Sequence, residues 1–133
     1  MLPITTILTS VLSLVFVWLS MQVIKRRRQL KVVIGTGGEK ELEWAMRAQG
    51  NFSEYVPIAL ILFACAEYNK TDWRVLSIFA AALICGRLMH AYGFLFARED
   101  FGLRVKGMIL TFWTIIALSI WNLGFLAYQA LDR

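Results

Sequence analysis

The chain has 133 residues, of which 59% are hydrophobic, and this length allows a single domain. Its mean hydropathy of +0.61 is well above that of a soluble globular domain, so the composition indicates a membrane protein. The net charge of +5 comes from basic residues at the ends of apolar segments. Nucleic acid is therefore an unsuitable partner, because binding it requires a basic face exposed to water.

The first predicted helix covers residues 3–28 and consists mainly of an apolar span. Leu2 to Ile24 carry no charge, and this run exceeds the ~20 residues that cross the hydrocarbon core of a bilayer. A secretory signal peptide has a basic segment before its apolar run and small residues at a cleavage site after it. In this chain a basic cluster follows the run instead: Lys25, Arg26, Arg27, Arg28 and Lys31. We therefore expect a membrane helix that is retained.

The second helix is predicted over residues 39–68, after a glycine-rich stretch at residues 35–38. Thr36 followed by Glu39 is a capping-box pattern, which favours a helix start at this point. The stretch has neither the lysine nor the preceding strand of a phosphate-binding loop, so it does not support a nucleotide site. The helix begins amphipathic and becomes apolar after Glu54. Pro57 is expected to bend it, because proline removes one backbone hydrogen bond.

Two more helices are predicted, over residues 72–96 and 103–130, and Gly107 to Leu131 is a second uncharged run long enough to span a bilayer. Four helices with short connections favour antiparallel neighbours. The sequence thus predicts one all-α domain, residues 1–133, folded as a transmembrane up-down bundle of four helices. The positive-inside rule places the basic first and third loops in the cytoplasm and both termini on the opposite side.

Polar side chains interrupt the second and third helices on one face each. Arg47, Asn51 and Glu54 have the spacing i, i+4, i+7 and share a helix face. His90 shares a face of the third helix with Arg87 and Phe94. Charged side chains at membrane depth are costly unless they meet a partner, a cavity or a ligand. These faces are therefore the first place to expect a functional site.

The arginines of the predicted bundle gather at one level, because the first and third loops lie on the same side. The residues at this level are Arg27, Arg28, Arg47, Arg87 and Arg104. Arginine binds carboxylates through paired hydrogen bonds, a glutamate can bind an ammonium group, and an arginine beside a thiol favours the thiolate. We expect a pocket for a small anion with carboxylate groups, placed between subunits because one thin bundle has little room.

Simpler interpretations remain open. Arg47 and Glu54 would also fit an ion pair, residues 26–28 a topology anchor, and Arg104 an interfacial side chain that reaches toward water. His90 would also fit a packed, hydrogen-bonded residue. A proton-coupled multidrug transporter would use a lone membrane carboxylate such as Glu54, but the surrounding arginines would repel cationic drugs. A single histidine, with two cysteines inside apolar segments, supports neither a metal site nor a disulfide framework.

Three segments together resemble the MAPEG family, the membrane-associated proteins in eicosanoid and glutathione metabolism. The segment from Arg47 to Pro57 (RAQGNFSEYVP) is similar to the family signature. Gly86 to Gly93 (GRLMHAYG) resembles the third-helix motif, and residues 22–24 followed by Arg27 and Arg28 resemble the end of the first helix. The resemblance covers nearly the whole chain and is strongest to the bacterial branch of microsomal glutathione transferases.

The resemblance implies a homotrimer of four-helix subunits in the bacterial inner membrane, with glutathione bound between subunits near the cytoplasmic face. By motif position, Arg104 is the catalytic arginine that stabilises the glutathione thiolate. Arg98 is a rival for this role, because the loop before Arg104 is slightly longer than in some members, and Phe94 stands where several members have tyrosine. The residues implied to bind glutathione are Arg27, Arg28, Arg47, Asn51, Glu54, Tyr55, Arg87 and His90.

The implied activity is that of a membrane glutathione transferase acting in detoxification, with glutathione as co-substrate and no metal. A hydrophobic electrophile would reach the site from the surrounding lipid, and a lipid hydroperoxide would serve as substrate for an additional peroxidase activity. The alternative is a non-enzymatic membrane protein that uses the same fold to bind a lipid or a partner. That alternative predicts weak affinity for glutathione and tolerance of substitution at Arg104.

Overall fold

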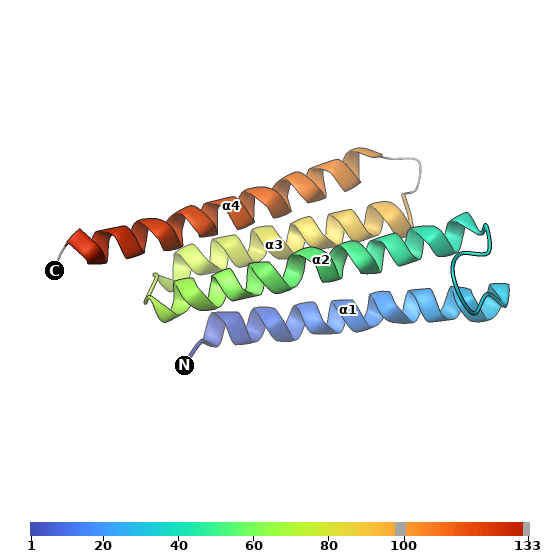
Figure 1. The fold of residues 1–133 in the computed structure, drawn as a ribbon, viewed down its shortest axis with the longest axis horizontal. Coiled ribbons are helices and arrows are strands. Elements are labelled where there is room, and N and C mark those ends of the chain that lie inside the picture. The colour runs from blue at the N-terminus through green and yellow to red at the C-terminus, as the bar shows by residue number, and fades with distance from the viewer. Residues whose placement is uncertain (98–100, 132–133) are drawn as a thin grey trace.

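The computed structural model describes residues 1–97 and 101–131. These residues form four α-helices: α1 (Pro3–Leu30), α2 (Lys40–Tyr68), α3 (Trp73–Leu95) and α4 (Phe101–Leu131). Successive helices run in opposite directions, and α1 begins at the end of the bundle where α4 finishes (Figure 1). The predicted helices agree with these bounds to within two residues at each end. The up-down helical bundle expected from the sequence is confirmed.

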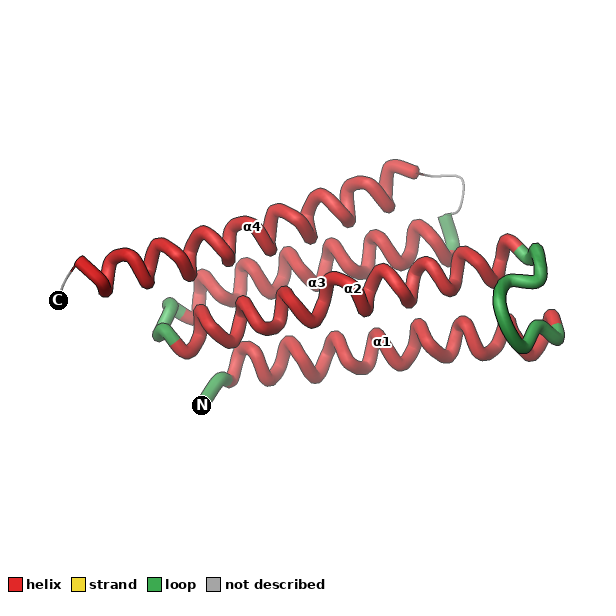
Figure 2. Tube along the Cα trace, viewed as in Figure 1, coloured by secondary structure: helices red, strands yellow, loops and turns green. Residues whose placement is uncertain are grey.

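Three of the four helices in the described part of the chain are long and apolar enough to cross a membrane, namely α1, α3 and α4. Helix α2 has the length but carries charged residues through its first half, including Glu41, Glu43 and Arg47. It nevertheless lies beside the other helices along most of its length (Figures 1 and 2). Many large apolar side chains of α1 and α4 are exposed, which suits contact with lipid rather than water.

The start of α2 differs from the sequence prediction in its detail. Glu39 occupies the N-cap position, but no side chain caps the helix, so the expected capping box is not formed. The Thr36 hydroxyl instead accepts a hydrogen bond from the backbone N–H of Gly38 (3.3 Å). The physical reason is the loop itself: Gly35, Gly37 and Gly38 all have positive φ, and this turning backbone satisfies Thr36 before the helix begins. Figure 2 shows this loop connecting the ends of α1 and α2.

The core of the bundle forms along α2, which presents small and aromatic side chains to its neighbours. Ala48, Phe52, Ala59 and Phe63 are all almost completely buried. Pro57 lies inside α2, and the helix continues on both sides of it. The two cysteines in the apolar segments, Cys65 and Cys85, are free thiols on exposed helix faces.

Helices α3 and α4 approach each other most closely, because glycines face each other across their contact. A Cβ atom added at Gly107 would lie 2.6 Å from the Gly86 carbonyl oxygen and 2.7 Å from the backbone nitrogen of His90, closer than a Cβ atom can approach either atom. Only glycine therefore fits at Gly107. This close approach brings the second half of α3 against the start of α4, where the polar residues gather.

A carboxylate joins α1 to α2 at the end of the bundle opposite the polar residues. Glu67, near the end of α2, accepts hydrogen bonds from the backbone N–H groups of Ile4 (2.8 Å) and Thr5 (2.7 Å). The first N–H groups of a helix have no partner inside the helix, and they carry a partial positive charge that a carboxylate stabilises. Glu67 thus caps α1 from a neighbouring helix.

Candidate functional site

The polar face of α2 lines an open cavity of about 420 Å³. Arg47, Asn51 and Glu54 share this face, as their spacing predicted, and His90 reaches the same cavity from α3. Arg47 and Glu54 are exposed, Asn51 is half-buried and His90 is buried. Met46, Gly50 and Phe94 complete the lining. The cavity thus presents a cation, an amide, a carboxylate and an imidazole within one site.

Arg87 lies beneath this cavity and does not line it. Its side chain is 0% exposed, and its Nη2 donates to the Oδ1 of Asn51 over 2.6 Å. Its Nη1 points at the sulfur of Met108 (3.7 Å), and its guanidinium carbon lies 5.9 Å from the ring centres of both Phe52 and Tyr55. Among the described residues, the hydrogen bond to Asn51 is what joins Arg87 to the lining of the cavity.

His90 is anchored to the start of α4. Its Nδ1 lies 2.9 Å from the backbone carbonyl oxygen of Arg104. A carbonyl oxygen can only accept, so Nδ1 carries the hydrogen and donates it. The other ring nitrogen, Nε2, is buried without a hydrogen-bond partner among the described residues. The imidazole ring also packs edge-to-face on Phe94, with ring centres 5.1 Å apart.

Arg104 lies in the first turn of α4 and is 8% exposed. Its Nε donates to the Gly93 carbonyl oxygen (3.1 Å), and its guanidinium carbon lies 4.5 Å from the ring centre of Phe94 and 4.8 Å from that of Phe101. A Cβ atom at Gly93 would come within 2.7 Å of the Arg104 side chain, so this contact requires glycine. Phe94 lines the cavity, and Arg104 approaches the cavity through that ring.

The remaining predicted residues lie around the cavity and not in its lining. Arg27 holds the loop after α1: its Nη1 donates to carbonyl oxygens of that loop, including that of Gly35 (3.1 Å), and its Nη2 points at the sulfur of Met46 (3.4 Å). Arg28 is exposed near the end of α1. Tyr55 packs edge-to-face against Phe112 of α4, with ring centres 5.2 Å apart.

The structure therefore brings together Arg47, Asn51, Glu54 and His90. Arg87 contacts this set directly through Asn51, whereas Arg27 reaches the cavity lining at Met46 and the Arg104 guanidinium reaches it at Phe94. Sequence reasoning missed Met46, Gly50 and Gly93. Gly50 was detectable, because it is three residues from Arg47 and so lies on the same helix face. Arg98, the rival for the catalytic position, lies outside the described residues.

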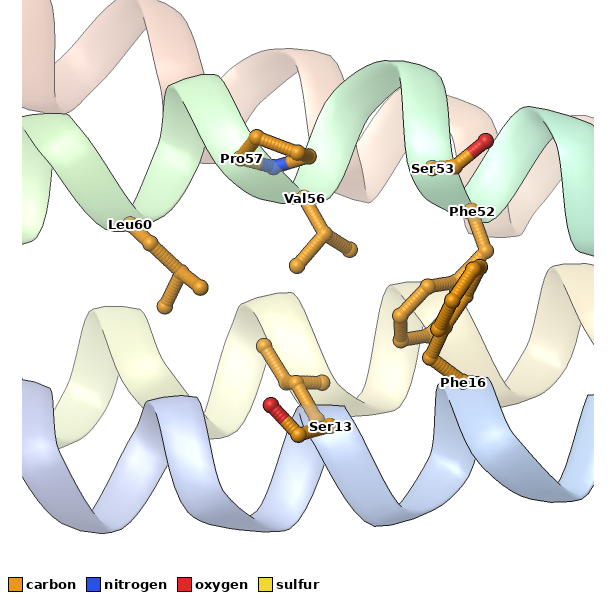
Figure 3. Close-up of a pocket in the computed structure, with 8 residues that line it drawn as sticks. Ser13, Phe16, Phe52, Ser53, Val56, Pro57 and Leu60 are labelled. Carbon is orange, nitrogen blue, oxygen red and sulfur yellow. The ribbon is translucent and has the colours of Figure 1, made fainter.

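A second, smaller cavity of about 190 Å³ lies between α1 and α2 and is mainly apolar. Phe16 of α1 and Phe52 of α2 stack at its side, with ring centres 6.2 Å apart (Figure 3). Val56, Pro57 and Leu60 continue its lining along α2 (Figure 3). Phe52 also faces the guanidinium of Arg87, so the apolar and polar cavities flank the same segment of α2.

Comparison with known proteins identifies a family and related membrane proteins. The sequence matches the model of the MAPEG family over residues 5–124. Inner membrane protein YecN of Escherichia coli strain K12 is 36% identical over 110 residues, which cover 83% of this chain and 82% of YecN. YecN of Escherichia coli O6:H1 strain CFT073 gives the same values. Together with the apolar helices, these matches support an integral protein of the inner membrane.

Proposed function

We propose, because the chain belongs to the MAPEG family, that it is a membrane-bound glutathione transferase. The family includes glutathione transferases, and the observation that carries the proposal is the cavity shared by Arg47, Asn51, Glu54 and His90. Its volume of about 420 Å³ lies within the range of small-molecule sites. The exposed ends of Arg47 and Glu54 give a ligand one binding group of each charge.

Glutathione matches this arrangement in charge and in length. The tripeptide carries carboxylates, which pair with Arg47, and an ammonium group, which pairs with Glu54. The seven-residue separation of Arg47 and Glu54 corresponds to about 10 Å along a helix. An extended tripeptide spans about the same distance. Asn51 lies between them on the same face and is positioned to bind the peptide or a carboxylate.

The chemistry we propose is attack by the glutathione thiolate on an electrophile that arrives from the lipid. The thiol releases its proton to water in the open cavity, sulfur bonds to the electrophilic carbon, and the leaving group departs with the electron pair of the broken bond. Arg104 would stabilise the thiolate where the ligand passes Phe94, the residue that contacts both the cavity and the guanidinium. With a lipid hydroperoxide the same thiolate would attack the terminal oxygen and break the O–O bond, so that the lipid alcohol leaves and the glutathione sulfur becomes a sulfenic acid. A second glutathione would then convert the sulfenic acid to a disulfide and water, which completes the proposed peroxidase activity.

The proposed assembly is a homotrimer, with the open cavity facing a neighbouring subunit. The exposed apolar side chains of α1 and α4 supply surface for such contacts and for lipid. The proposed orientation puts the first and third loops in the cytoplasm. It is supported by the position of Arg27, Arg28 and Arg104 at the helix ends that share one end of the bundle.

A non-enzymatic role is the second candidate, and the surroundings of Arg104 favour it. The guanidinium donates to the Gly93 carbonyl oxygen and stacks on two rings, and it does not line the polar cavity. A protein that only binds a lipid or a partner would need nothing more from this residue than packing.

One experiment separates the two candidates. Protein purified in detergent is titrated with glutathione while the ultraviolet absorbance of the thiolate is followed, and conjugation of a generic aromatic electrophile is then measured. A transferase gives both signals, and Glu54→Gln weakens glutathione binding because the ammonium group loses its partner. Glu43→Gln is the control, since it removes an exposed carboxylate on α2 that does not line the cavity. Absence of both signals in the wild-type protein would refute the transferase.

A further inference from the structure

Arg87 is a fully buried cation that has no carboxylate partner among the described residues. Its side chain is 0% exposed and contacts an amide, a thioether and two aromatic rings. Its Nε is buried without a hydrogen-bond partner in the same part of the chain. A charge removed from water and left without a counter-charge is costly, most of all in a membrane protein. Packing alone does not explain an arginine at this position, because an apolar side chain would fill the space at lower cost.

The hydrogen bond to Asn51 fixes how that amide is oriented. Arg87 can only donate, so the short contact of 2.6 Å assigns the Asn51 oxygen to the arginine. The amide nitrogen is the remaining polar end of a side chain that lines the cavity, and it has no hydrogen-bond partner in the described structure. This nitrogen is not buried, so a ligand in the cavity can reach it. The cavity is thus presented with an N–H donor whose strength is raised by the cation behind it.

We infer that Arg87 is a positioning residue which orients Asn51 as a donor, and that a carboxylate of the ligand in the cavity is the counter-charge Arg87 lacks. The identity of that ligand as glutathione rests on the proposed function. Arg87 acts through Asn51 and does not touch the ligand, whereas Arg47 contacts it directly from the exposed face of α2. Arg87 and Asn51 together make the part of the cavity beside Asn51 selective for a negatively charged hydrogen-bond acceptor.

The first test removes the cation and keeps its bulk. Arg87→Met is expected to weaken glutathione affinity by about tenfold to a hundredfold, the range for a charge-assisted hydrogen bond. Turnover at saturating glutathione should change by less than about threefold. Arg87→Lys, which keeps the charge, should restore part of the affinity. The control is Arg74→Met, an exposed arginine of the same helix at the far end of the bundle.

A neutral ligand distinguishes an effect of the Arg87 charge on binding from a general disturbance of the cavity. Glutathione diethyl ester keeps the peptide but loses the negative charge of its carboxyl groups. Wild-type protein should prefer glutathione over the ester, and Arg87→Met should reduce that preference by about tenfold or more, because it lowers affinity for the acid and leaves affinity for the ester nearly unchanged. The preference that remains comes from Arg47, which the variant keeps. A merely structural role for Arg87 would weaken the binding of both ligands equally, and that result would overturn the inference.

The second test needs no ligand and remains available where Arg87→Met fails to fold. Asn51→Asp supplies the missing counter-charge inside the protein, so it should unfold at a temperature no lower than wild type and well above that of Asn51→Ala. It should also lose glutathione affinity by more than about tenfold, because its carboxylate takes the place of the ligand's. Gln129→Glu, which adds a negative charge at an exposed position on α4, is the control and should leave both properties unchanged.

The outcomes distinguish this inference from the proposed function. If wild-type protein binds no glutathione but Asn51→Asp is stabilised relative to Asn51→Ala, glutathione is the wrong ligand and the charge on Arg87 still lacks its partner, as inferred. If glutathione binds and Arg87→Met binds it as tightly as wild type, the proposed function stands and the inference is overturned. Equal unfolding temperatures for Asn51→Asp and Asn51→Ala would also overturn it.

Discussion

A methyl group added at Gly107 should destabilise the contact between α3 and α4 by an amount that follows from the distances across it. In Gly107→Ala the new methyl group would lie 2.6 Å from the Gly86 carbonyl oxygen, against about 3.4 Å for an ordinary contact, so the helices must separate by about 0.8 Å. The same movement lengthens the contact between His90 and the Arg104 carbonyl from 2.9 Å to beyond hydrogen-bonding distance. Overpacking costs about 1–3 kcal/mol, and alanine returns up to about 1 kcal/mol through helix propensity. Loss of the His90 hydrogen bond adds about 1 kcal/mol and offsets that gain, so the expected net destabilisation is about 1–3 kcal/mol.

The assay compares thermal unfolding in detergent with conjugation activity for two variants of the same helix. Gly124→Ala is the matched control, since nothing lies within 4 Å of its added Cβ and only the propensity gain remains. Gly107→Ala should unfold at a lower temperature than wild type, while Gly124→Ala should unfold at an equal or higher one. Activity should fall in Gly107→Ala alone, because His90 and Arg104 lose their common anchor. Equal unfolding temperatures for the two variants would refute this account of the helix contact.

The remaining predictions concern the catalytic arginine, the far end of the bundle and its orientation. Arg104→Ala should reduce conjugation turnover far more than glutathione affinity in steady-state kinetics and calorimetry, and if Arg98→Ala does so instead, the position of the catalytic arginine is wrong. Glu67→Gln should lower the free energy of unfolding by about 1–2 kcal/mol, since it removes the charge that caps α1, and an unchanged denaturation midpoint would contradict this. In a cysteine-free background, a membrane-impermeant maleimide should label Lys70→Cys in intact spheroplasts and Thr36→Cys only after lysis, and the reverse pattern would invert the topology.

The helices were predictable because their signal is long and redundant. The apolar runs and the basic residues at their ends each indicate the same membrane spans, so an error at one residue does not change the predicted position of a helix. The start of α2 shows the limit of this reasoning. Thr36 and Glu39 have the spacing of a capping box, but the loop glycines turn the backbone so that Thr36 bonds Gly38 instead. The spacing of two residues does not predict the conformation of the glycines between and before them, and that conformation decides which hydrogen bond Thr36 forms.

The site was predictable as a set of residues and not as an arrangement. The spacing of Arg47, Asn51 and Glu54 identifies their common face, and the cavity lies on it. Helical spacing also puts Arg87 on one face with His90, but spacing does not say which neighbour that face meets. Burial of Arg87 behind Asn51 depends on how deeply α2 and α3 pack together. The sequence also could not predict the hydrogen-bond partner of His90, because that partner is a backbone carbonyl of another helix.

The carboxylate of Glu67 has a consequence for how the protein is made. Helix α1 is synthesised first, and its leading N–H groups have no side-chain cap within the helix, so they wait for a group from α2. That group is near the end of α2 and returns to the same side of the membrane as the start of α1. The cap therefore requires both helices of the α1–α2 hairpin, and Glu67 becomes available only when the end of α2 has been synthesised. A chain that stopped just after α1 would lack this cap.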